Sequence, residues 1–198
     1  MTPARLVVLI SGSGTNLQAI LDACQDGSLP AQVTAVFSNK SGAYGLERAR
    51  QASVPAIVVS KPPEQDRACY DASLAAQVAA YQPDWVILAG WMRLLTSAFL
   101  SRFPNRVMNL HPALPGAFAG THAIERAYEA FQAGSIHYTG VMVHLVPDEG
   151  VDNGPLLGQE IVPIYASDSL AELEERVHAT EHLLLVQVLK RVIIPSSS

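Results

Sequence analysis

Asn109 and His111 stand two positions apart at the end of a short apolar run, and both carry side chains that can act in acyl transfer. If the run is a β-strand that continues through them, both side chains project from the same face. An amide N–H and an imidazole together can stabilise an oxyanion and move a proton. Strand ends are also where open α/β sheets place their sites. The alternative is an Asn–His pair that only caps loop backbone.

Residues 11–16 read Ser-Gly-Ser-Gly-Thr-Asn and lie between an apolar run and an amphipathic segment. A glycine-rich turn there lets backbone N–H groups close on a phosphate, and Ser13, Thr15 and Asn16 add donors. The spacing matches neither the dinucleotide nor the Walker pattern, and the absence of lysine disfavours a nucleoside triphosphate. The alternative is a tight turn that needs glycine for positive φ, with Thr15 as the helix N-cap.

Two carboxylates are further candidates. Asp152 lies in a turn-rich acidic loop, residues 147–155, whose composition alone is typical of solvated surface. Glu181 follows Val177 by four positions beside the apolar stripe of the last predicted helix, so it should pair with a buried group or a ligand. An ion pair with an arginine is the alternative. No His or Cys spacing typical of a metal site accompanies them, so we expect no metal.

These candidates need a scaffold, and the apolar pattern predicts an α/β one. Strands are expected at residues 5–10, 33–37, 56–59, 85–89, 106–110, 138–146 and 159–164, with helices after residue 16, at 45–52, 64–81 and 122–133, and from residue 169. The first five strands are apolar throughout and alternate with helices, which predicts a mostly parallel central sheet covered by helices on both faces. The last two strands alternate in part and predict a C-terminal antiparallel portion.

The composition excludes several classes of protein. The chain has 198 residues, 49% of them hydrophobic, and a net charge of −5, which is unlike a disordered chain. A pI near 5.6 disfavours a surface built for nucleic acid, and no apolar run reaches the roughly 18 residues of a membrane span. The N-terminal segment lacks the pattern of a signal peptide, and Cys24 and Cys69 fit reduced thiols. We therefore expect a cytoplasmic protein.

Five motifs occur in one order that resembles the phosphoribosylglycinamide formyltransferases, a family that uses 10-formyltetrahydrofolate. They are residues 5–16, residues 37–39 with 45–49, residues 89–90 with 92–94, residues 109–112, and residues 148–152 with 154–155. The resemblance covers about residues 5–190. It implies a single-domain, Rossmann-like formyltransferase fold over residues 1–198. Residues 1–100 would form a phosphate-binding βαβ half, and residues 101–198 a catalytic and folate-binding half.

The resemblance also implies a reaction, in which the amine of glycinamide ribonucleotide attacks the formyl carbon of 10-formyltetrahydrofolate in purine biosynthesis. Asn109 and His111 would donate to the oxyanion of a tetrahedral intermediate. Asp152 would raise the pKa of His111, favour its imidazolium form and help to relay the proton. The residues expected at the substrate's phosphate and ribose are Gly12, Ser13, Gly14, Thr15, Asn16 and Glu181. Those expected at the folate are Arg67, Met92, Arg93, Leu94, Leu95 and Val151, with His144 near the acceptor amine.

The same resemblance implies the partners. They are the two small molecules, without nucleic acid, membrane or metal, and the chain would be a monomer or a homodimer. Three positions depart from the family pattern. Residues 113–116 carry Pro115 one place early, and Trp91 stands where a smaller aromatic residue is usual. His178 stands where the family often has a basic residue, and a partly protonated histidine would be a weaker partner for the phosphate.

Three alternatives stay open. Formyltetrahydrofolate hydrolase resembles the catalytic half and uses water as acceptor, but it carries an N-terminal regulatory domain that we do not expect here. Methionyl-tRNA formyltransferase shares the Asn-His-Asp set but needs a C-terminal RNA-binding domain, which we also do not expect. A nucleotide-binding module without chemistry would keep the phosphate-binding loop, and it predicts that Asn109, His111 and Asp152 do not converge.

Overall fold

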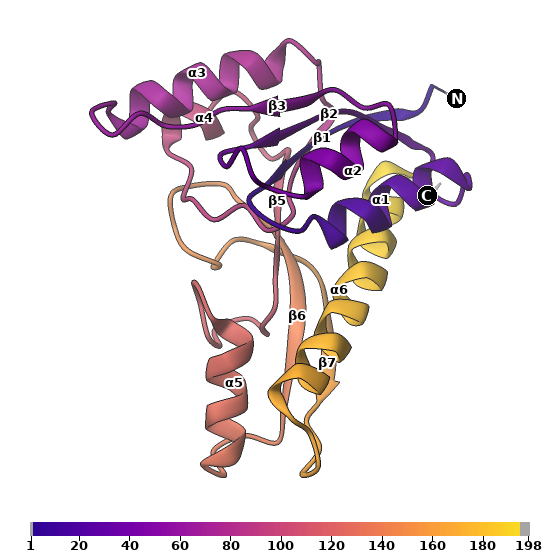
Figure 1. Ribbon diagram of the computed structural model, residues 1–198, viewed down its shortest axis with the longest axis vertical. Coiled ribbons are helices and arrows are strands. Elements are labelled where there is room, and N and C mark those ends of the chain that lie inside the picture. The colour runs from indigo at the N-terminus through magenta and orange to yellow at the C-terminus, as the bar shows by residue number, and fades with distance from the viewer. Residues whose placement is uncertain (1, 195–198) are drawn as a thin grey trace.

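A seven-stranded sheet runs through residues 2–194, the part of the chain that the computed structural model describes (Figure 1). Its strands are β1 (Ala4–Ile10), β2 (Ala31–Ser38), β3 (Ala56–Val58), β4 (Trp85–Leu88), β5 (Val107–His111), β6 (Tyr138–Leu145) and β7 (Leu156–Pro163). Their spatial order is β3-β2-β1-β4-β5-β6-β7. Neighbours are parallel from β3 to β5 and antiparallel from β5 to β7. The predicted α/β fold with its antiparallel C-terminal portion is confirmed.

Six helices pack on this sheet in the described residues. They are α1 (Thr15–Gln25), α2 (Gly45–Gln51), α3 (Arg67–Ala79), α4 (Ser97–Leu100), α5 (Ala123–Gln132) and α6 (Leu170–Ile193). Their apolar side chains form two clusters. Those of α1, α2, α5 and α6 pack on one face of the sheet, and those of α3 and α4 on the other. None of the described helices is both long and apolar enough to cross a bilayer.

Alternation along β1 explains why both faces of the sheet are apolar. Leu6, Val8 and Ile10 belong to the first cluster, whereas Val7 and Leu9 belong to the second, and all five are fully buried. Successive side chains of a strand point to opposite faces, so a strand covered on both sides needs apolar residues at every position. This requirement accounts for the continuous apolar run that the sequence shows.

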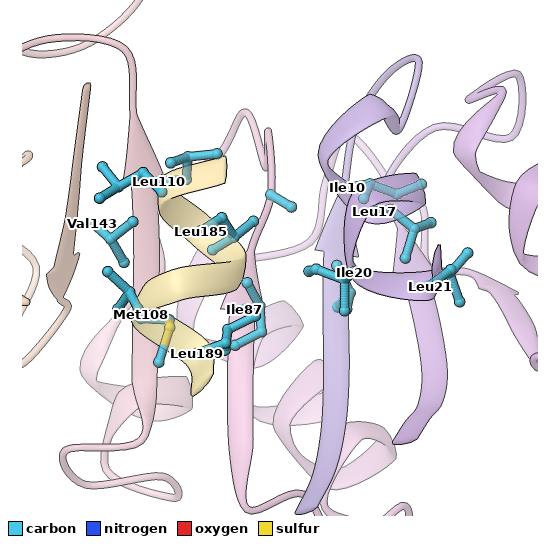
Figure 2. Packing of buried hydrophobic residues seen from close by; sticks show 14 of the residues in the cluster. Ile10, Leu17, Ile20, Leu21, Ile87, Met108, Leu110, Val143, Leu185 and Leu189 are labelled. Atoms are coloured by element: carbon cyan, nitrogen blue, oxygen red, sulfur yellow. The ribbon is translucent and has the colours of Figure 1, made fainter. Parts of the chain in front are cut away.

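The long helix α6 covers the strands that carry the candidate site. Leu185 and Leu189 pack against Ile87 of β4 and Met108 of β5, as Figure 2 shows. Complete burial of such a side chain contributes roughly 1.5–3 kcal/mol. A capping box between Ser169 and Glu172 fixes the start of α6. The packing of α6 on this face of the sheet therefore stabilises the position of β5.

Three details differ from the sequence-based prediction. The short helix α4 was not expected, because four residues are too few to show a periodic pattern. Strand β7 begins at Leu156, three positions before the predicted residue 159, and pairs along β6 from there. Gly14 is the N-cap of α1, with a left-handed φ of 72°, and Thr15 is already the first helical residue. In the alternative interpretation of this turn, the positive φ at a glycine is therefore confirmed, whereas Thr15 as the N-cap is wrong.

Candidate active site

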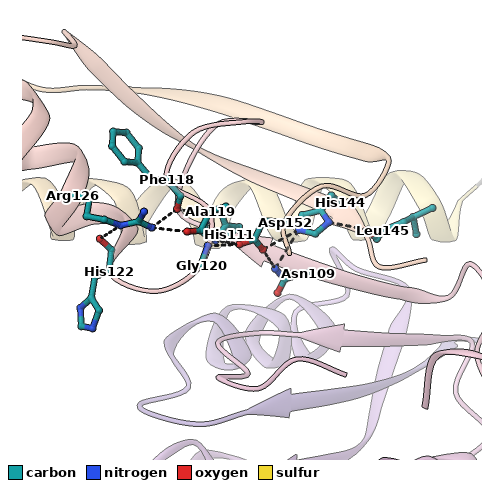
Figure 3. A network of polar contacts seen from close by, with 10 residues as sticks. All are labelled: Asn109, His111, Phe118, Ala119, Gly120, His122, Arg126, His144, Leu145 and Asp152. Carbon is teal, nitrogen blue, oxygen red and sulfur yellow. Dashed lines mark hydrogen bonds and ion pairs between the residues drawn. The ribbon is translucent and has the colours of Figure 1, made fainter. Parts of the chain in front are cut away.

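Asn109 and His111 meet Asp152 at the end of β5 (Figure 3). Both lie within the strand, so the prediction that they share a face is confirmed. Nδ2 of Asn109 donates to Oδ1 of Asp152 at 3.0 Å, and Nδ1 of His111 lies 3.3 Å from Oδ2. Asp152 comes from the loop between the antiparallel strands β6 and β7. The three side chains converge, which contradicts the prediction of the module without chemistry.

Asp152 is held from several sides. Its backbone is left-handed, with a φ of 50°, and its carboxylate is nearly buried. Burial opposes ionisation of this carboxyl group. The ring of His144, whose Nε2 lies 3.5 Å from Oδ1, the backbone N–H of Gly120 at 2.8 Å and the charge of His111 together outweigh burial and lower the pKa of Asp152 below its ordinary value. Asp152 is therefore ionised at neutral pH.

His111 has an acceptor at each ring nitrogen. Its Nε2 lies 3.1 Å from the backbone oxygen of Phe118, and Nδ1 faces Asp152. Burial nevertheless lowers the pKa of His111, and the charge of Asp152 and the Phe118 carbonyl offset that effect only in part. The expectation of a raised pKa is wrong in its net direction, although Asp152 acts with the expected sign. The ring is mainly neutral at pH 7.

His144 fixes the amide of Asn109. It lies on β6 directly opposite Asn109 and is 3% exposed. Its Nδ1 lies 2.8 Å from the backbone oxygen of Leu145, so that nitrogen carries the proton. Its Nε2 lies 3.3 Å from Nδ2 of Asn109 and is left to accept. Both amide hydrogens of Asn109 therefore have protein partners, one on His144 and one on Asp152.

The glycine loop, residues 11–16, lies between β1 and α1. Nδ2 of Asn16 contacts Oε2 of Glu181 at 3.3 Å, and Nδ1 of His178 contacts the same oxygen at 2.7 Å. Glu181 is 5% exposed. Its partners are an asparagine and a histidine, so the alternative of an ion pair with an arginine is wrong. The hydrogen bond to Glu181 raises the pKa of His178 above its ordinary value. The loop and α6 thus share one polar cluster.

A cavity of about 640 Å³ opens beside the glycine loop. It is lined by residues 11–13, by residues 39–44 that follow β2, and by Ser60. Lys40 of this lining is an exposed cation that the sequence analysis did not select. The volume is in the range that holds a small ligand, and the lining offers hydroxyl groups, backbone N–H groups and one positive charge.

The β4–α4 loop, residues 89–96, contains the residues expected at the folate. Met92 is 62% exposed and Leu94 is 49% exposed, whereas the side chain of Leu95 is buried. Arg67 donates to the backbone oxygen of Leu94 at 3.4 Å, and the Arg93 guanidinium lies 5.2 Å from the ring centre of Tyr70. Leu95 can therefore meet a ligand only through its backbone.

Val151 and Trp91 are the other residues that the sequence analysis associated with the folate site. Val151 is 39% exposed in the loop that carries Asp152. Trp91 is buried in the second cluster, and its indole nitrogen has no partner in the described residues. Glu149 joins the Asp152 loop to the start of α4, because its Oε1 accepts from the backbone N–H of Ser97 at 2.9 Å. Across residues 2–194, no group of His, Cys, Asp and Glu side chains is arranged to hold a metal ion.

Comparison with known proteins identifies the family. Residues 4–189 match the family model described as formyl transferase. The chain belongs to the formyl transferase family. It is 50% identical over 203 residues to a phosphoribosylglycinamide formyltransferase of Schizosaccharomyces pombe, with 96% of this chain and 97% of that protein covered. It is 43% identical to the Escherichia coli enzyme of the same name, with 90% and 82% covered.

Solved structures of the same kind share the fold. The crystal structure of glycinamide ribonucleotide transformylase 1 from Symbiobacterium toebii matches this chain with a TM-score of 0.91 and 42% identity. The match covers 97% of this chain and 88% of that one. The formyl transferase fold inferred from the sequence motifs is thereby confirmed.

Several groups in this formyl transferase were not expected from sequence. The backbone oxygen of Phe118 and the backbone N–H of Gly120 contact His111 and Asp152, and no sequence pattern marks them, because every residue has such groups. Arg126 holds the same segment by donating to the backbone oxygens of Phe118 and Ala119 at 2.7 and 2.8 Å. The sequence placed Arg126 near the start of a predicted helix, but it did not indicate a contact with the preceding loop.

Proposed function

We propose that this formyl transferase transfers the formyl group of 10-formyltetrahydrofolate to the amine of 5′-phosphoribosylglycinamide, which gives formylglycinamide ribonucleotide and tetrahydrofolate. The observation that carries the proposal is the convergence of Asn109, His111 and Asp152, whose contacting atoms lie 3.0 and 3.3 Å apart. The names of the relatives that match nearly the whole chain support this choice of substrates.

The side chains suit attack by an amine. The amine nitrogen forms a bond to the formyl carbon, and the carbonyl oxygen becomes negative. The Asn109 amide and the His111 ring stabilise that oxygen, and each preorganised donor of this kind contributes roughly 10²–10³ in rate. The negative oxygen raises the pKa of His111, and Asp152 supports the imidazolium that forms. The proton released by the attacking amine passes by way of this pair to N10 as the bond from N10 to the formyl carbon breaks.

The glycine loop suits the ribonucleotide. Backbone N–H groups of Gly12, Ser13 and Gly14 and the start of α1, with Thr15 and Asn16, would hold the phosphate. A buried carboxylate is a strong acceptor for ribose hydroxyls, which supports the assignment of Glu181 to the sugar. The position of Asn16 against Glu181 brings these two parts of the site together.

The β4–α4 loop suits the folate. Met92 and Leu94 offer exposed apolar surface for the pterin ring, together with Val151. Arg93 and Arg67 would face the glutamate carboxylates of the cofactor. Leu95 would contribute backbone polar groups, and His144 would lie near the acceptor amine through its contact with Asn109.

We further propose that the chain works in the cytoplasm as a monomer or homodimer. Its two cysteines are free thiols, which suits a reducing compartment. Neither nucleic acid nor a metal ion has a part in the proposed reaction, because direct attack by the amine needs neither. Light scattering at working concentration measures the oligomeric state.

The experiment that tests the reaction mixes purified protein with 10-formyltetrahydrofolate and follows folate absorbance with and without glycinamide ribonucleotide. We expect turnover only in the presence of the amine. Turnover without the amine would indicate a hydrolase that uses water as acceptor. No turnover in either case would contradict the proposed function.

A further inference from the structure

Ser11 is a buried hydroxyl that joins the glycine loop to the β4–α4 loop. Its side chain is 5% exposed, and its Oγ donates to Oδ1 of Asn39 at 2.7 Å. The same Oγ accepts from the backbone N–H of Met92 at 2.8 Å. The residue directly before Gly12 is thus tied to the most exposed residue of the β4–α4 loop.

Alternate residues of the β4–α4 loop are anchored in this way. Besides the N–H of Met92, the backbone oxygen of Leu94 accepts from Arg67, and the backbone N–H of Thr96 donates to Asp71 at 2.6 Å. These anchoring side chains come from α3 and from the end of β1. The loop is therefore fixed at residues 92, 94 and 96 by three side chains from outside it.

The residues between these anchors keep free backbone donors. In the described part of the chain, neither Arg93 nor Leu95 donates its backbone N–H to any acceptor. A pterin ring carries a carbonyl oxygen and ring nitrogens that accept hydrogen bonds. The loop is held at every second residue, so these donors are preorganised for such a ligand. Binding then costs little conformational entropy.

We propose that Ser11 is a positioning residue for the folate, and that Asn39 orients its hydroxyl for this task. The inference rests on the proposed function, since it assigns the folate to the β4–α4 loop. The single hydroxyl oxygen of Ser11 donates to the amide oxygen of Asn39 and accepts from the N–H of Met92 at once, which its removal would end for both contacts. Because Ser11 also starts the glycine loop, it sets the separation between the two bound substrates. A displacement of about 1 Å in such a site can reduce the rate by about 10²-fold.

The test compares three variants of the whole enzyme. Ser11→Ala removes the bridge and should raise KM for 10-formyltetrahydrofolate by about five- to twentyfold, the effect of one hydrogen bond. Asn39→Ala removes only the partner that orients the hydroxyl and should act in the same direction, more weakly. Thr34→Val is the matched control, since Oγ1 of Thr34 donates to the backbone oxygen of Leu6 at 3.1 Å within β2, away from both loops. It should change KM for the folate by less than about twofold.

The affinity for glycinamide ribonucleotide, measured by calorimetry, separates positioning from general loss of structure. We expect its Kd to stay within about twofold in Ser11→Ala, because the backbone donors of the glycine loop are retained. An unchanged KM for the folate, or an equal rise in both constants, would overturn the proposal. If Ser11→Ala does not fold, Asn39→Ala decides by the same criteria. An inactive wild-type enzyme would instead contradict the proposed function.

Discussion

The backbone oxygen of Phe118 lies 3.1 Å from Nε2 of His111, the ring nitrogen that would meet the formyl oxygen. The side-chain amide of Asn109 is similarly engaged, because its hydrogens point to Asp152 and His144. The proposed oxyanion donors therefore also contact acceptors of the protein itself. Buried donors without a partner are costly, so these contacts stabilise the positions of the two side chains. Substrate must take over these hydrogen bonds.

Release of Phe118 is the first prediction. In a structure with both ligands bound, we expect Nε2 of His111 to contact the ligand oxygen and the Phe118 oxygen to lie beyond hydrogen-bond distance. Arg126→Ala, which frees the oxygens of Phe118 and Ala119, should speed amide hydrogen exchange over residues 117–120 and lower kcat by about threefold or more. Arg102→Ala, at an exposed arginine, is the control. Unchanged exchange in Arg126→Ala would contradict this account.

Asp152→Asn keeps the shape of the site and removes its charge. We expect kcat to fall by about 10²-fold or more, with a modest change in KM. The charge of Asp152 raises the pKa of His111 against the stronger effect of burial, so its removal should lower that pKa further. NMR titration of the His111 ring measures the shift. Asp84→Asn, a distant substitution, should leave kcat within about twofold. A rise in the His111 pKa, or near-normal kcat, would refute the assigned role.

Binding of the ribonucleotide should depend on pH through His178. Glu181 raises the pKa of this ring, so the positive charge is present below that raised pKa and is lost as the pH increases through it. The attraction between the negative substrate phosphate and His178 should fade over the same pH range. Calorimetry in a pH series that starts at the ordinary histidine pKa of 6.5 and increases should therefore show a rising Kd. His178→Lys should flatten this dependence, whereas His137→Lys should not.

A side chain at Gly14 should destabilise the protein. Its φ is 72°, and a Cβ there would lie 2.6 Å from Cα of Gly45. We expect Gly14→Ala to lose about 1–3 kcal/mol of unfolding free energy in urea, and to weaken phosphate binding because the loop must move. Gly27→Ala is the matched control, since its φ of 79° carries the same strain but its Cβ would meet nothing within 4 Å. Equal losses in both variants would show that the contact with Gly45 is unimportant.

Local patterns were sufficient for part of the site and insufficient for the rest. Asn109 and His111 could be paired from their spacing, because strand periodicity alone puts them on one face. Asp152 has no such local signature and was placed by family resemblance. The raising effect of Asp152 on the pKa of His111 was predicted correctly, but the net direction was not, because burial of the ring outweighs it and local sequence does not reveal that burial. Ser11 was noted only as part of a motif, because its partners Asn39 and Met92 are distant in sequence.

The position of α6 in the chain has a consequence for biosynthesis. A ribosome makes this helix after every strand of the sheet, yet Leu185 and Leu189 cover Ile87 and Met108 on the middle strands. Until residue 193 has been synthesised, that surface stays open to water and to other nascent chains. The apolar face of the sheet is therefore complete only after α6 has been made and has packed on β4 and β5.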